Sequence, residues 1–153
     1  MSALEKIRKW IATFPDHQKL TDFQVDYTDA VPNNGGIFPS GLVEISRTKD
    51  IFGTTTVANQ YNFGLYYVFE KPTGDDEHAA INADWVMDFQ EWVQDQSIRG
   101  QAPTFGDDPQ SERIQAQNGV LYAADEEGTA TYMVQLSVTF TKTIRSESQW
   151  LKL

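Results

Sequence analysis

Apolar residues recur at three- and four-residue steps at the start of the chain, which places them on one side of an α-helix. These residues are Leu4, Ile7, Ile11 and Phe14. Ser2 belongs to the residue types that cap helix N-termini, and Pro15 cannot continue a helix. The pattern predicts an amphipathic helix over residues 3–14.

A second pattern, the alternation of apolar and polar residues, predicts strands. It begins with Phe23, Val25 and Tyr27 and stops at the VPNNGG segment, whose composition is typical of a loop. From residue 42 to residue 69 the chain is rich in β-branched and aromatic residues. We expect the breaks in this region at Gly53 and at Ala58-Asn59.

The end of this region has the pattern of a central strand. Five large side chains share one of its faces: Tyr61, Phe63, Leu65, Tyr67 and Phe69. Tyr66 and Val68 add apolar residues to the other face. We therefore expect a strand that is buried on both sides at one end.

A helix is predicted from about residue 77 to residue 97. The PTGDDEH segment supplies a turn and several carboxylates, which are favourable at the positive end of a helix dipole, and Gly100 follows the helix. The expected core face consists of Ile81, Trp85, Val86, Phe89, Trp92 and Val93.

The last third of the chain predicts a long antiparallel hairpin after a loop, QAPTFGDDPQS. Its first strand has Ile114, Ala116, Val120 and Tyr122 at alternate positions, and the DEEG segment turns the chain. The second strand alternates from Tyr132 through Val134, Leu136 and Val138 to Phe140.

These elements predict one α+β domain over residues 1–153, with residues 145–153 as a C-terminal tail. The order is α-β-β-β-α-β-β, and two helices can pack on one face of a mainly antiparallel sheet of four to five strands. The rim of such a sheet exposes unpaired backbone groups, which proteins either protect or use to pair with another subunit.

Composition narrows the classes of function. The chain has no cysteine, so thiolate metal sites and disulfides are excluded. Its formal net charge is −10, which repels nucleic acid and anionic membrane surfaces. Residues 70–128 hold most of the acids, whereas both ends of the chain are mildly basic.

No catalytic residue, metal site or cofactor site is predicted, and we expect the chain not to be an enzyme. His17 and His78 are far apart in sequence, and the Asn34-Gly35-Gly36 segment does not have the spacing of a phosphate-binding loop. Acidic pairs such as Asp107-Asp108 are typical of solvated turns.

The predicted second helix carries four carboxylates at steps of four, three and four: Asp84, Asp88, Glu91 and Asp95. This spacing places them on one stripe opposite the core face, and we call them the acidic stripe. Like charges at such spacing cost about 0.2–0.5 kcal/mol per pair in an isolated helix. Two interpretations stay open: the ordinary wet surface of an acidic protein, or a negative wall that faces a channel or a basic partner.

Further residues are candidates for contact with a second subunit or a partner. Ile51 and Phe52 lie in the KDIFGT connection and are either turn anchors or an exposed contact tip. The C-terminal tail either docks on its own domain or reaches a neighbour. The remaining candidates are Asp125, Glu126, Glu127, Trp150, Leu151 and Leu153.

Three phrases and the order of elements resemble a known family. The phrases are LEKIRKWIATFP, DWVMDFQEWVQDQ and NGVLYAADEEGTATYMVQLSVTFTK. In this respect the chain resembles the small tail-completion proteins of long-tailed bacteriophages of Gram-positive hosts, often labelled minor capsid or tail terminator proteins.

The resemblance implies an α+β subunit that assembles into a hexameric ring and ends polymerisation of the tail tube. Its partners would be further copies of itself, the tail tube protein and a head-completion protein of the neck. It would act in the virion at the tail-neck junction, after assembly in the host cytoplasm, with no membrane partner. DNA would pass through the ring without specific binding, and the acidic stripe is our candidate for the channel wall.

Other functions stay open from the sequence. A head-tail connector or stopper would share size, acidity and ring formation. A protein-binding module that uses a sheet edge would be a monomer with an open strand. A small-ligand or enzyme domain would need convergent polar groups in a pocket, built from residues far apart in the chain.

Overall fold

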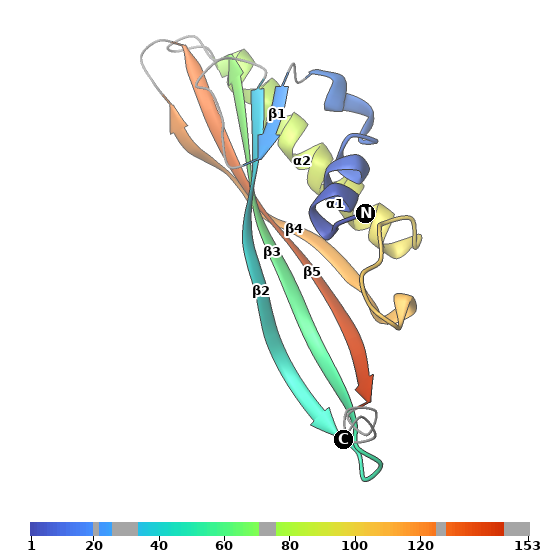
Figure 1. Ribbon diagram of the computed structural model, residues 1–153. Helices are drawn as coiled ribbons and strands as arrows, with labels where there is room; N and C mark the ends of the chain where they lie inside the picture. The colour runs from blue at the N-terminus through green and yellow to red at the C-terminus, as the bar shows by residue number, and fades with distance from the viewer. Residues whose placement is uncertain (20–21, 26–33, 71–75, 125–127, 146–153) are drawn as a thin grey trace.

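The computed structural model describes residues 1–19, 22–25, 34–70, 76–124 and 128–145. In chain order its helices and strands are α1 (Ala3–Ile11), the 3-10 helix η1 (Pro15–Lys19), β1 (Asp22–Val25), β2 (Asn34–Lys49), β3 (Thr54–Glu70), α2 (Asp76–Ile98), the 3-10 helix η2 (Pro109–Ser111), β4 (Arg113–Ala124) and β5 (Thr129–Arg145). The predicted α+β class, with two helices and an antiparallel sheet, is confirmed (Figure 1).

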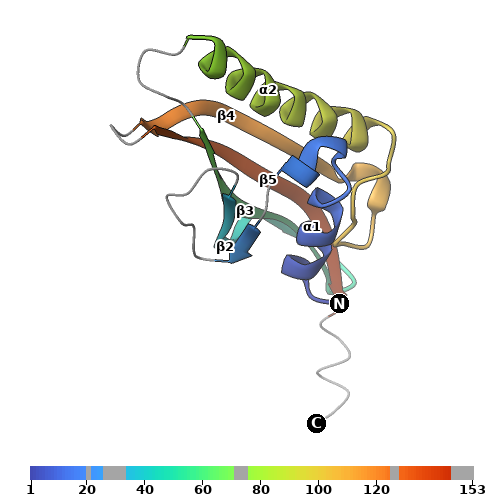
Figure 2. The ribbon, with the colours of Figure 1, turned by 90° about the horizontal axis from the view of Figure 1, so that it is seen from above.

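The strands form one sheet in the order β1-β2-β3-β5-β4. β2, β3, β5 and β4 pair antiparallel, and the four-residue strand β1 pairs parallel with β2. Both helices lie on the same side of the sheet, and no described helix covers the opposite face (Figure 2).

A core of apolar side chains joins the two layers. Odd-numbered residues of β3 and even-numbered residues of β5 point toward the helices, as the alternation predicts. The fully buried members with the largest side chains are Tyr67, Phe69, Phe89, Ile7, Ile11, Ile37, Leu65 and Leu136.

Aromatic rings form the contact between the helices. Trp10 of α1 stacks on Trp92 of α2 with ring centroids 4.8 Å apart, and Phe14 meets Phe89 edge-on at 5.4 Å. The indole N–H of Trp10 donates to the side chain of Gln96 at 3.1 Å. This bond satisfies the polar atom of a ring that is otherwise in an apolar environment.

Three expectations about element bounds are wrong. The first helix ends at Ile11 rather than at residue 14, although Phe14 still packs in the core. Gly35 and Gly36 are buried in β2 rather than in a loop, because they lie between β1 and β3 and pair with both. Ala58-Asn59 is no break, because this part of β3 pairs with strands on both sides.

One expected core position of α2 is also wrong. Ile81 is 48% exposed, whereas Asn82, one residue later, is 2% exposed. The rotation of the helix places Asn82 on the same side as Trp85, Val86 and Phe89, and its amide donates to the carbonyl of Glu70 at 3.0 Å. A hydrogen bond at the end of β3 therefore replaces the expected apolar contact.

We predict that Phe89→Ala lowers the free energy of unfolding by about 3–5 kcal/mol, because it removes a fully buried ring and leaves a cavity. Chemical denaturation followed by tryptophan fluorescence measures this change. The neighbouring Asp88→Ala is the control, because Asp88 is exposed, and its effect should stay within about 0.5 kcal/mol. Equal losses for the two variants would contradict the described orientation of α2.

Candidate protein-interaction surfaces

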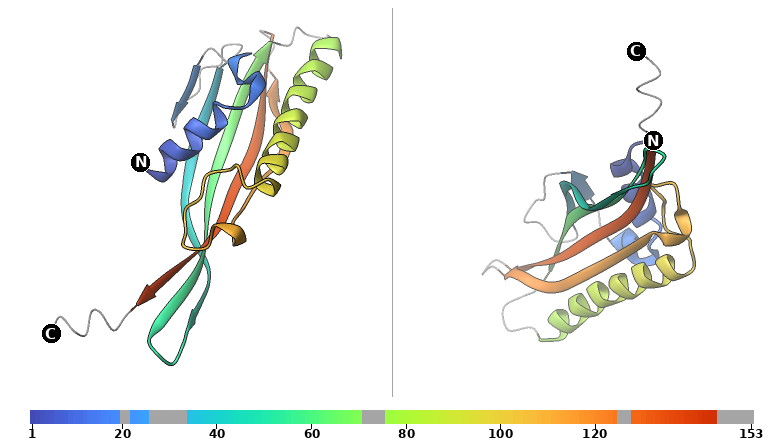
Figure 3. Two further views of the ribbon diagram at one scale, coloured as in Figure 1. Left: turned by 90° about the vertical axis from the view of Figure 1, so that its right-hand side faces the viewer. Right: turned by 90° about the horizontal axis from the view of Figure 1, so that it is seen from below.

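Strands β2, β3 and β5 extend well beyond the helices and form a projecting arm (Figures 1 and 3). We define the arm as residues 42–58 of β2 and β3 together with residues 141–145 of β5. β2 pairs with β3 from Leu42 opposite Tyr61 to Lys49 opposite Thr55, with one register shift after Glu44, and on the other side β3 pairs with β5 as far as Thr54 opposite Arg145. Every residue from 39 to 52 is exposed, so neither face of β2 in this region contacts the core.

The tip of the arm is a hydrogen-bonded turn. The Asp50 carboxylate accepts from the backbone N–H of Phe52 at 2.9 Å and of Thr54 at 3.0 Å. Gly53 has φ +84°, a conformation that side chains rarely adopt. These contacts fix the turn and leave Ile51 and Phe52 pointing away from it, 94% and 77% exposed. Of the two alternatives for this pair, the structure favours the exposed tip.

The base of the arm is attached to the body by aromatic contacts. Tyr61 stacks on Phe140 with centroids 5.1 Å apart, and Phe105 from the loop before η2 meets Tyr61 at 5.9 Å. Lys6 of α1 lies over the Phe105 ring and donates to the carbonyl of Thr104 at 2.9 Å. The arm therefore leaves the body from a packed base.

The same loop covers one edge of the arm. The Asp107 N–H donates to Thr141 O at 2.9 Å, and the Asp107 carboxylate accepts from Thr143 N at 2.7 Å. A side chain at Gly106 would collide with the backbone of Thr141, so this close approach requires glycine. The loop thus protects the edge of β5 beyond the end of its pairing with β4.

The arm carries apolar side chains that stay exposed among the residues the structure describes. Leu42 is 54% exposed and Ile144 is 51% exposed. The full set is Leu42, Val43, Ile45, Ile51, Phe52 and Ile144. Leu42 and Ile144 lie on the face that the helices cover in the body, and Val43 lies on the other. Exposed apolar residues gathered on one element are typical of surfaces that bind another protein.

The register assigns several charged residues of the arm to one face, the continuation of the face that the helices cover in the body. Arg47, Val57 and Lys142 lie side by side across the three strands, and Lys49, Thr55 and Ile144 form the next row. Arg47 pairs with Glu44 at 2.7 Å. We call this the basic arm face; it combines three cations and one anion with apolar side chains.

The two edges of the sheet differ. On β4, the Gln90 amide of α2 donates to Ala116 O at 3.2 Å, and the Ser97 hydroxyl accepts from Ile114 N at 3.2 Å. These bonds occupy backbone groups that an added strand would need. On β2 beyond β1, Pro39 and register shifts after Pro39 and Glu44 interrupt the edge, and residues 46–49 stay regular.

The four residues of the acidic stripe are brought together as predicted along the exposed side of α2. Asp95 binds the Arg99 guanidinium at 2.8 Å, and this contact raises the pKa of Arg99. Exposed apolar residues flank the stripe: Ile81, Met87 and Ile98. Helix α2 has no lysine or arginine, and its outer side is negative except at its C-terminal end, where Arg99 pairs with Asp95.

The remaining predicted contact residues fall elsewhere. Asp125, Glu126 and Glu127, like Trp150, Leu151 and Leu153, lie outside the described residues, and so does the tail beyond Arg145. His17 lies in η1 and His78 in α2. Burial lowers the pKa of the His17 imidazole. Among the described residues, no group of three or more histidine, aspartate or glutamate side chains could hold a metal ion.

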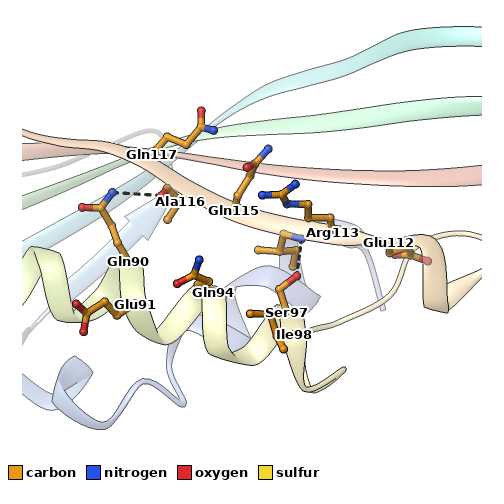
Figure 4. A pocket seen from close by; sticks show the side chains of 11 residues that line it. Gln90, Glu91, Gln94, Ser97, Ile98, Glu112, Arg113, Gln115, Ala116 and Gln117 are labelled. Atoms are coloured by element: carbon orange, nitrogen blue, oxygen red, sulfur yellow. Dashed lines mark hydrogen bonds between the residues drawn. The ribbon is translucent and has the colours of Figure 1, made fainter.

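A groove of about 480 Å³ lies between α2 and β4 (Figure 4). Four glutamines line it, Gln90 and Gln94 from the helix and Gln115 and Gln117 from the strand. A second depression, of about 370 Å³, lies on the uncovered face of the sheet and is lined by uncharged residues such as Asn62, Gln135 and Ser137. The first groove also holds the charged side chains of Glu91, Glu112 and Arg113, and the Glu112 carboxylate accepts from the backbone N–H groups of Phe105 and Gly106.

Comparison with known proteins adds no assignment: no protein-family model matches the chain, and no curated protein sequence matches it. In the part of the chain that the structure describes, no helix has the length and apolarity needed to cross a bilayer.

The sequence pattern located the tip of the arm but not the arm itself. The length of the β-rich region could have predicted the arm, because β2 has 16 residues and β3 has 17, against about five or six in an average strand. Strands this long extend beyond helices of 9 and 23 residues, because a strand rises about 3.3 Å per residue and a helix about 1.5 Å.

We predict that Ile51→Ser combined with Phe52→Ser leaves the free energy of unfolding within about 0.5 kcal/mol of the parent value, because neither side chain packs in the core. Thermal or chemical unfolding measures it. Leu65→Ala is the matched control. Because Leu65 is fully buried, this variant should lower the free energy of unfolding by about 2–5 kcal/mol. A loss of that size in the double variant would mean that the tip packs on its own subunit.

Proposed function

We propose that the chain is a structural assembly subunit, a tail terminator that caps the phage tail tube as a ring, ends tube polymerisation and provides the docking face for the neck. The observation that carries this proposal is the arm, a preformed element whose apolar side chains are exposed in the described part of the subunit. The resemblance of the chain to tail-completion proteins is our reason for proposing this particular assembly, a ring on the tail tube.

A ring requires that each subunit offer two different surfaces. Contacts between unlike surfaces are head-to-tail, and they close into a ring when the rotation between copies permits. The arm projects at one end of the molecule, and the exposed side of α2 lies along the body (Figure 3). Two such separated surfaces support a ring better than a two-fold dimer.

A structural role rather than catalysis is supported by the lining of the two depressions. Uncharged residues line the second, and in the first the Glu112 carboxylate accepts from the backbone N–H groups of Phe105 and Gly106, while the Ser97 hydroxyl accepts from Ile114 N. The net charge of −10 favours a ring through which DNA slides without adhering. The placement of the acidic stripe on the channel wall stays a prediction.

Two other assignments fit parts of the same evidence. A head-tail connector or stopper would use the same surfaces with a different partner. A binding module that adds a strand to a sheet edge would use the regular end of β2, residues 46–49. Partner specificity separates the first from a terminator, and oligomeric state separates the second.

We predict that the purified chain forms rings, alone or at the ends of tail tubes, and that it shortens tubes when added during polymerisation of the tail tube protein of the same phage. Light scattering after size exclusion measures the mass, and negative-stain images show tube ends and lengths. The Ile51→Ser, Phe52→Ser double variant serves as a folded comparison. A chain that stays monomeric and leaves tube length unchanged would rule out the terminator assignment.

A further inference from the structure

The basic arm face and the exposed side of α2 are complementary in charge. The arm face carries Arg47, Lys49 and Lys142 against one anion, Glu44. Helix α2 carries six acidic residues and no lysine or arginine between Asp76 and Ile98. In a chain of net charge −10, this face of the arm is a local concentration of positive charge.

The two surfaces also match in apolar content and in length. The arm face presents Leu42 and Ile144, and α2 presents Ile81, Met87 and Ile98 around the acidic stripe. Residues 42–49 span roughly 23 Å as a strand. Residues 81–98 span roughly 26 Å as a helix. Each surface is long enough to cover the other.

A subunit cannot satisfy this pairing by itself. The arm projects past the ends of both helices, and the structure holds it there through Tyr61, Phe105 and Phe140 (Figures 1 and 3). In the body, the same side of the sheet is covered by the subunit's own helices. A helix from another molecule laid on the arm would continue this arrangement.

The geometry points to a second copy of this chain as the occupant: the basic arm face of one subunit docks on the acidic stripe of α2 in the next. The contact joins unlike surfaces, so it can repeat head-to-tail, and it closes into a ring when the rotation between copies permits. This inference rests on the proposed function and specifies its subunit interface. It assigns the acidic stripe to the contact between subunits instead of the channel wall.

Charge reversal on each side tests the contact. Lys49→Glu with Lys142→Glu makes the arm face negative, and Asp84→Lys with Asp88→Lys makes the stripe positive. Each double variant should raise the dissociation constant for self-association at least about tenfold, because like charges then face one another. Sedimentation or light scattering over a concentration series measures this. Added NaCl should weaken association of the parent chain.

The decisive measurement combines the two double variants. In an equimolar mixture, each negative arm meets a positive stripe and each parental arm meets a parental stripe, so association should return with the two variants alternating. A single chain that carries all four substitutions should also associate. Exposed residues of α1 and η1 provide matched controls: Arg8→Glu with Lys9→Glu, and Glu5→Lys with Asp16→Lys should associate like the parent.

The outcomes separate this inference from the proposed function. If the parent chain forms rings or caps tubes while both double variants associate normally, the interface is wrong and the terminator assignment stands; a stripe that lines the channel gives this result. If both variants lose association but neither the mixture nor the fourfold variant restores it, the arm and the stripe contact other molecules. A parent chain that neither self-associates nor caps tubes overturns both.

Discussion

The packing of the α2 aromatic rings against the central strands is the constraint on which the rest of the molecule depends. Trp85 and Phe89 meet Tyr67 with centroids 4.8 and 5.7 Å apart, and Phe14 of the N-terminal segment closes the cluster from the other side. This contact fixes how far along the sheet the helices reach. The strands are longer than the helices that cover them, so the same contact that builds the core also determines where the sheet is left bare.

The two edges of the sheet are protected to different degrees. In the body, polar groups of α2 bind the outer backbone of β4, and at the start of the arm the loop before η2 binds the outer backbone of β5. Both sets of bonds protect that side from an added strand. In the arm, β2 has an interrupted edge but fully exposed faces. Side-chain contact through a face is therefore the available mode of association, and pairing through an edge is restricted to a few residues.

The local pattern of the sequence was sufficient to predict the elements that pack against one another. The alternation from Tyr132 to Phe140 and the helical spacing around Trp85 and Phe89 each reflect one buried face, and both are found in the core. The errors have a different origin. Gly35 and Gly36 lie in a strand because β1 and β3 pair with them, and no window of neighbouring residues contains that information.

Of the two candidate surfaces, one could be predicted from local sequence and the other could not. The acidic stripe could be read from spacing alone, because a helix converts spacing directly into a face. The basic arm face could not, since Arg47 and Lys142 are almost 100 positions apart and meet only through the register of β3 between them. The exposure of Ile51 and Phe52 depends on the Asp50 turn, whose carboxylate contacts are a three-dimensional property.

The Asp50 turn, the packed base and the strand pairing have one further consequence for the proposed assembly. Because the arm is already folded in the single subunit, docking of a neighbour in the proposed ring would not require a disordered segment to fold, and the associated loss of conformational entropy would be small. Preorganisation of this kind lets even a modest contact area hold subunits together. It also means that the timing of assembly is set by the encounter of finished subunits rather than by folding at the contact.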